Sequence, residues 1–67
     1  MPEFKEKIRI DDVTILRTTD MAVLCEIDGS EFWIPQSQID DGSEVWEEGD
    51  EGMLVISKWI ADQKGLG

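Results

Sequence analysis

Histidine is absent from this sequence, and Cys25 is its only cysteine. An intrachain disulfide needs two cysteines, and most zinc sites and activated nucleophiles are built on cysteine or histidine. The sequence also contains no glycine-rich phosphate loop and no nucleophile-elbow motif. We therefore expect a protein that is not an enzyme, that uses no metal or cofactor, and that acts by binding. Cys25 lies in an apolar stretch without a neighbouring cation, which predicts a buried, unreactive thiol.

Positive charge is scarce, because six lysines and arginines stand against sixteen aspartates and glutamates, for a net charge of −10. No cation occurs between Arg17 and Lys58, an interval with eleven carboxylates. A surface that neutralises the phosphates of nucleic acid or lipid has the opposite charge. The charge therefore argues against broad binding to nucleic acid or to anionic membranes, and it favours a protein partner with a basic surface.

Long apolar runs are also missing. The run at 53–56 is far shorter than a membrane-spanning helix, and residues 1–5 lack the apolar stretch of a secretion signal. With 67 residues the chain is large enough for only one modest core. These features predict one small domain over residues 1–67, located in the cytoplasm and not attached to a membrane.

The N-terminal part of the chain carries an alternating pattern. Apolar residues alternate with cations over 4–10, which is typical of a strand with one apolar and one charged face. Asp11-Asp12 interrupts this pattern before an extended piece resumes at 13–17. The sequence fits either two short strands or one long bent strand.

The clearest local pattern is a β-hairpin centred on residues 28–29, Asp-Gly, which tolerate positive φ. A two-residue turn pairs 23–27 with 30–34 and places Glu26 opposite Glu31. Two carboxylates in such a pair cost stability unless solvent or a partner separates them. The pairing gives each face its own set: Val23, Cys25, Phe32 and Ile34 toward the core, and Leu24, Glu26, Glu31 and Trp33 on a half-wet face.

The middle of the chain is predicted to return to the core and then to leave it. Pro35 ends the hairpin, a short helical turn at 36–38 brings Ile39 back to the core, and an acidic loop follows at 40–52. The apolar run at 53–56 is short enough for a central strand buried on both faces.

A short C-terminal helix is predicted to begin after Ser57, a good N-cap residue, and to end at Gly65, with Leu66 packing back onto it. Since so short a helix is unstable alone, Trp59 and Ile60 are expected to pack on the sheet, with Trp59 in the core. The overall prediction is a mainly β fold: a small SH3-like or similar β-barrel of four to five short strands with a short C-terminal helix.

The acidic loop at 40–52 is the first candidate binding site. Its spacing does not fit a calcium loop, because Gly42 stands at a ligand position and Val45 at the position of the required glycine. Trp46 is the best candidate for an exposed aromatic anchor, with Trp33 second; plain packing and a merely solubilising loop are the alternatives. The residues assigned to contact with a basic protein partner are Glu44, Trp46, Glu47, Glu48, Asp50 and Glu51.

The cations near the N-terminus form a second candidate site. Lys5, Lys7 and Arg9 share one strand face, so they fit an anion-binding stripe for a nucleotide or single-stranded nucleic acid, with Trp33 as a stacking surface. The same charges on an edge strand would instead discourage aggregation. The residues assigned to this alternative are Lys5, Lys7, Arg9, Arg17 and Trp33.

Two segments, 23–39 and 59–66, resemble parts of small proteins encoded by bacteriophages and prophages. The specific part is the heptad 33–39, Trp-Ile-Pro-Gln-Ser-Gln-Ile, in which Gln36 stands where those proteins have lysine. The resemblance implies a phage protein in the host cytoplasm that binds a host or phage protein and inhibits a host defence system. A sequestering or replication-accessory nucleotide binder and a subunit of a phage assembly are the alternatives, with a homo-oligomer left open.

Overall fold

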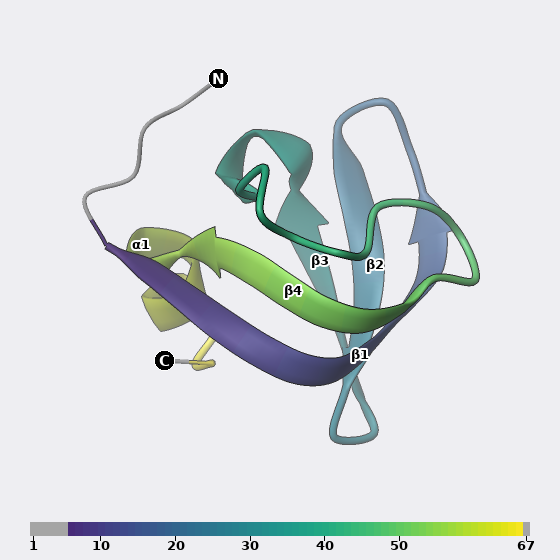
Figure 1. Cartoon of the computed structure of the whole chain (residues 1–67), viewed down its shortest axis with the longest axis horizontal. Coiled ribbons are helices and arrows are strands. Elements are labelled where there is room, and N and C mark those ends of the chain that lie inside the picture. The colour runs from purple at the N-terminus through teal and green to yellow at the C-terminus, as the bar shows by residue number, and fades with distance from the viewer. Residues whose placement is uncertain (1–5, 67) are drawn as a thin grey trace.

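Four antiparallel strands form one sheet in a computed structural model that describes residues 6–66 (Figure 1). The elements are β1 (Lys7–Thr18), β2 (Ala22–Ile27), β3 (Ser30–Pro35), the 3-10 helix η1 (Gln36–Gln38), β4 (Glu51–Ser57) and α1 (Lys58–Gln63). The order across the sheet is β3-β2-β1-β4. The fold is mainly β with a short C-terminal helix, as predicted, and the sheet does not close on itself. Lys5 lies outside the described residues.

Strand β1 is one long strand rather than two. Asp11-Asp12 does not end it: Ile10 pairs with Leu54 and Val13 pairs with Gly52, so one extra residue of β1 is accommodated as a bulge. Asp12 has φ of 58°, a conformation that aspartate tolerates better than most residues. The bulge lets β1 keep apolar residues toward the core on both sides of the two aspartates.

The β2–β3 hairpin has the predicted register. Ile27 pairs with Ser30 and the ladder continues to Ala22 and Pro35, with Glu26 opposite Glu31. The turn residues at 28–29 have φ of 52° and 79°, the positive values of the two-residue turns that match the twist of paired strands. The local sequence was therefore sufficient to predict this element.

The heptad 33–39 is used mainly to connect the hairpin to the rest of the fold. Pro35, with φ of −59°, directs the chain into η1. The backbone N–H of Gln36 donates to Met21 O at 2.8 Å, and its side-chain amide donates to Thr19 O at 2.6 Å. Gln36 thus ties the start of η1 to the β1–β2 turn.

The last part of the heptad joins the hairpin to β4. Ile39 is 1% exposed and forms an isolated antiparallel bridge with Ile56. Burial of an isoleucine side chain contributes about 1.5–3 kcal/mol to the free energy of folding, relative to leaving it exposed to water. Beside it, Ser57 Oγ donates to Gln38 Oε1 at 2.5 Å. The predicted return of Ile39 to the core is confirmed.

Strand β4 is buried on both faces, as predicted, but it lies at the end of the sheet and not in its centre. Its outer edge is not free, because the chain after η1 runs along it. Asp40 N donates to Val55 O at 2.8 Å, and Glu44 N donates to Met53 O at 2.9 Å. Residues 39–44 therefore take the place that a further strand would occupy beside β4.

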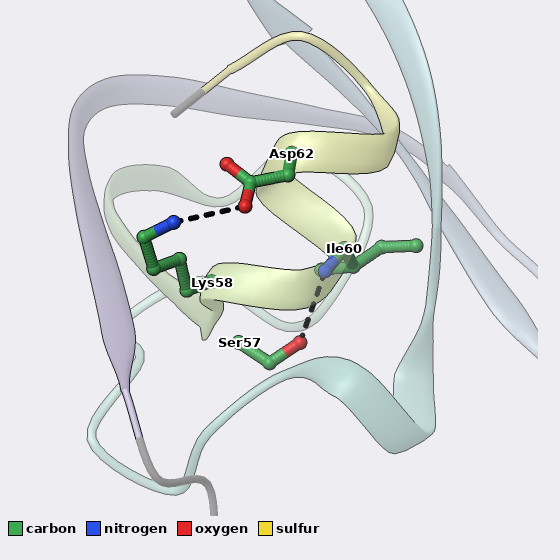
Figure 2. A network of polar contacts seen from close by, with 4 residues as sticks. All are labelled: Ser57, Lys58, Ile60 and Asp62. Carbon is green, nitrogen blue, oxygen red and sulfur yellow. Dashed lines mark hydrogen bonds and ion pairs between the residues drawn. The ribbon is translucent and has the colours of Figure 1, made fainter.

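Helix α1 begins where the sequence predicts it. Ser57 Oγ accepts a hydrogen bond from Ile60 N at 3.2 Å, and Lys58 pairs with Asp62 at 2.9 Å (Figure 2). Gly65 has φ of 73°, and the following N–H, that of Leu66, donates to Ala61 O at 2.7 Å, as in a Schellman cap.

The prediction that Trp59 belongs to the core is wrong. Its side chain is 61% exposed, whereas Ile60 and Ala61 are buried. A six-residue helix presents only a narrow face to the sheet, and successive residues point about 100° apart, so Ile60 and Ala61 leave Trp59 on the solvent side.

One cluster of buried apolar side chains joins all these elements. It includes residues from every strand, Ile39 and Val45 from the connection before β4, and Ile60 and Ala61 from α1. Among residues 6–66 no helix has the length and apolar character needed to cross a membrane.

Candidate functional site

Two of the carboxylates assigned to partner binding are used to hold the acidic loop itself. Asp50 Oδ2 accepts from the backbone N–H groups of Trp46 and Glu47 at 3.0 and 2.9 Å. Glu44 Oε1 accepts from Met53 N at 3.1 Å, so this side chain extends the pairing along β4. The backbone hydrogen bonds lower the pKa of Asp50 below its usual value. Glu44 and Asp50 are therefore structural parts of the loop.

Trp46 is not the exposed anchor that the sequence suggested. Its side chain is half-buried against the core cluster, and its Nε1–H donates to Ser43 O at 3.0 Å. The neighbouring Val45 is fully buried. Two adjacent apolar residues anchor the loop to the core, which explains how so acidic a segment keeps a defined path.

The remaining assigned carboxylates, Glu47, Glu48 and Glu51, are exposed. Among the hydrogen bonds and ion pairs of residues 6–66, their side chains take no part. These three side chains are the members of the original candidate set that a partner can reach without dismantling the loop.

The strand pairing places Glu51 in a row of side chains that crosses the whole sheet. Thr14 pairs with Glu51 of β4 on one side and with Glu26 of β2 on the other, and Glu26 pairs with Glu31 of β3. We call Glu31, Glu26, Thr14 and Glu51 the acidic row. Val13 and Ile15 on either side of Thr14 are buried, so the acidic row lies on the outer face of the sheet.

A second row lies beside the acidic row on the same face. Trp33 of β3 pairs with Leu24 of β2, and Leu24 pairs with Arg17 of β1. Trp33 is 44% exposed and Leu24 is half-buried. This arrangement brings an accessible aromatic ring next to the facing carboxylates of Glu26 and Glu31. Tryptophan is enriched among the residues that dominate protein interfaces, and the carboxylates select for a partner of opposite charge.

Sequence reasoning identified only part of this surface. The facing of Glu26 and Glu31 follows from the hairpin, but these residues were not assigned to a site. Their connection to Glu51 depends on Thr14, whose partners in β2 and β4 are far away in the sequence. No local pattern predicts such a pairing.

The N-terminal cations of the alternative site are only partly brought together. Lys7 forms an ion pair with Asp40 at 3.0 Å, and Arg9 Nε donates to Met53 Sδ at 3.2 Å. Arg17 lies toward the other end of β1, in the row with Trp33. The cations of the alternative site that lie within residues 6–66 therefore divide between two separate places on β1.

Within residues 6–66, the acidic side chains and Cys25 are the groups from which a metal centre or a reactive thiol would be built. No group of three Cys, Asp or Glu residues among residues 6–66 is placed to hold a metal ion. Burial raises the pKa of the Cys25 thiol to about 11, so almost none of it is thiolate at neutral pH.

Comparison of the chain with protein-family models, curated proteins and solved structures finds no match. The candidate site therefore rests on its own geometry.

Proposed function

We propose that this chain is a non-enzymatic binding protein whose outer sheet face receives a basic segment of a protein partner. The observation that carries the proposal is the acidic row beside Trp33. Its carboxylates attract cations, and the ring supplies the large apolar contact that dominates many interfaces. Exposed Glu47 and Glu48 add long-range attraction to the same kind of partner without contacting it.

The pairing of Glu26 with Glu31 supports a partner of this charge. The two residues are directly opposite each other on neighbouring strands, where like charges destabilise the sheet. A lysine or arginine of the partner placed beside them replaces this repulsion with attraction. The bound state therefore gains an interaction that the free protein lacks.

The biological role that we propose follows from the resemblance of the heptad 33–39 to small phage proteins. In this role the chain occupies a host or phage protein in the host cytoplasm and blocks its activity, for example that of a defence system. In this proposal the fold is a variant of the SH3-like type whose sheet stays open at β3. Of the large apolar side chains of the heptad, Trp33 is the one left accessible to a partner, because Ile34 and Ile39 are buried.

The test compares two double variants that change net charge by the same amount. Glu26→Gln with Glu31→Gln removes charge from the acidic row, while Glu47→Gln with Glu48→Gln removes it from the loop. Each immobilised protein is exposed to bacterial lysate and eluted with salt, and the retained proteins are identified by mass spectrometry. We expect a basic protein to be retained by the wild type and the loop variant and lost from the row variant.

Equal retention on both variants would show that the acidic row is not the contact. Equal loss of the basic protein from both variants would show that the interaction depends only on the overall charge of the chain. Retention of nucleotide or oligonucleotide without any protein would favour the cationic alternative on β1 over the proposed function.

A further inference from the structure

Strand β3 forms an open edge of the sheet. It pairs only with β2, and β3 is the last strand on its side of the order β3-β2-β1-β4. The opposite edge, at β4, is covered by residues 39–44 of the same chain. No backbone hydrogen bond joins the outer side of β3 to any other residue of 6–66. An uncovered strand edge is a template for an additional strand.

The register shows which backbone groups point outward from β3. In an antiparallel pair, residues alternate between hydrogen-bonded and non-hydrogen-bonded positions. The 2.8 Å bond from Gln36 N to Met21 O fixes the alternation at one end of the hairpin, and the two-residue turn fixes the same alternation at the other. Glu31 and Trp33 are then the non-hydrogen-bonded positions, so their N–H and C=O groups face the open edge.

The same two residues belong to the proposed binding face. Glu31 ends the acidic row at the open edge, and Trp33 ends the neighbouring row. A strand added beside β3 would place one side chain next to Glu31 and another next to Trp33, about 5 Å away across the new pair. The residue between them would lie over Phe32, which is half-buried at the margin of the core.

We propose that an extended segment of the basic partner adds to β3 as a fifth, antiparallel strand, hydrogen-bonded to the backbone of Glu31 and Trp33. This inference rests on the proposed function and specifies how the partner is recognised. Antiparallel pairing continues the pattern of the whole sheet. The side chains that complement β3 are an apolar residue opposite Trp33, an apolar residue opposite Phe32 and a cation opposite Glu31. The partner segment therefore reads apolar, apolar, cationic from its N-terminal side.

A second copy of this chain does not satisfy the open edge equally well. Each copy carries a net charge of −10, and pairing β3 with its own copy centred on Trp33 places Glu31 opposite Pro35. Proline has no N–H to donate, and no cation of the second strand reaches the acidic row. Pairing centred on Phe32 instead places Glu31 opposite Trp33 and avoids the proline, but it still joins two copies of the same strong negative charge. The charge therefore favours a basic segment from a different protein.

The experiment uses the full chain and a short synthetic peptide that contains Val-Val-Lys within a threonine-rich sequence. Antiparallel addition directs the N–H groups of the first valine and of the lysine toward β3, and that of the middle valine away from it. Methylation of either inward N–H removes a hydrogen bond while keeping the charge and the side chain. Methylation of the middle valine N–H is the matched control.

We expect methylation of the first valine or the lysine to weaken binding about tenfold. This change corresponds to one lost hydrogen bond whose contribution to the binding free energy lies at the upper end of the usual range, together with a local steric clash. Methylation of the middle valine should leave the affinity within about twofold. Equal affinity of all methylated peptides would overturn strand addition. If such binding still required Glu26 and Glu31, the proposed function would stand without it.

A pair of variants in β3 provides a second, independent measurement. Glu31→Gln and Glu31→Pro both remove the charge, but only proline also removes the outward N–H. Because this N–H does not pair with β2, proline is compatible with the edge position. We expect Glu31→Pro to bind the peptide several-fold more weakly than Glu31→Gln, and equal binding would contradict the use of the edge. Thermal unfolding identifies whether both variants keep the fold.

Discussion

Glu26 of β2 lies directly opposite Glu31 of β3 on the outer face of the sheet, at a position where paired side chains come closest. We expect Glu31→Gln to stabilise the free protein by about 0.5 kcal/mol, because it removes repulsion between like charges. Thermal unfolding at low ionic strength measures this gain, which should shrink in high salt. A loss of stability, or a gain that salt does not alter, would contradict the electrostatic interpretation.

Ser57 is predicted to contribute to stability through its side chain. It caps α1 at Ile60 N and donates to Gln38, so Ser57→Ala removes both contacts. We expect a loss of about 1 kcal/mol, equivalent to a fall in Tm of about 4–8 °C for a domain of this size. Ser37→Ala, at an exposed position in η1, is the matched control and should leave Tm nearly unchanged.

The acidic loop should open in acid before the core unfolds. Hydrogen bonds from Gly42 N and Lys7 lower the pKa of Asp40, and those from Trp46 N and Glu47 N lower the pKa of Asp50. A carboxyl group with a lowered pKa in the folded state stabilises the protein above its unfolded pKa, and this stabilisation is lost as pH falls through the folded pKa. Stability should therefore decline below about pH 4.

Asp50→Ala tests this account of the loop. The variant should have a lower Tm than the wild type at neutral pH, and its Tm should fall less steeply on acidification. Glu48→Ala, which changes an exposed neighbour without a side-chain hydrogen bond, should keep the pH dependence of the wild type. Identical profiles for Asp50→Ala and the wild type would contradict the role assigned to Asp50.

The three tryptophans are predicted to differ in their contact with water. Trp46 is half-buried, whereas Trp33 and Trp59 are 44% and 61% exposed. In proteins that retain one tryptophan each, with phenylalanine at the other two positions, Trp46 should emit at the shortest wavelength and be quenched least by acrylamide. If Trp46 were quenched as strongly as Trp59, the loop would not have the packing described above.

Much of the local structure follows from local sequence. The turn at Asp28-Gly29 and the alternation around it set the register of the hairpin, and Ser57 and Gly65 mark the ends of α1 because caps act within a few residues. These inferences required no knowledge of the tertiary fold.

Other features depend on contacts between distant segments. The apolar run of β4 does not reveal that residues 39–44 cover its edge, and the run alone fits a central strand equally well. The sequence does not distinguish the environments of Trp46 and Trp59. Trp46 packs against the core as an anchor of the acidic loop, whereas the narrow buried face of α1 leaves Trp59 in solvent. The acidic row exists only because Thr14 has partners in both β2 and β4.

The most direct test of the central claim is to titrate the isotopically labelled protein with the Val-Val-Lys peptide and follow each backbone amide by NMR. We expect the largest shifts at Glu26, Glu31 and Trp33, together with slower hydrogen exchange at the amides of Glu31 and Trp33. Shifts confined to residues 40–50, or to Lys7 and Arg9, would place binding elsewhere and contradict the claim that β3 and the acidic row receive the partner.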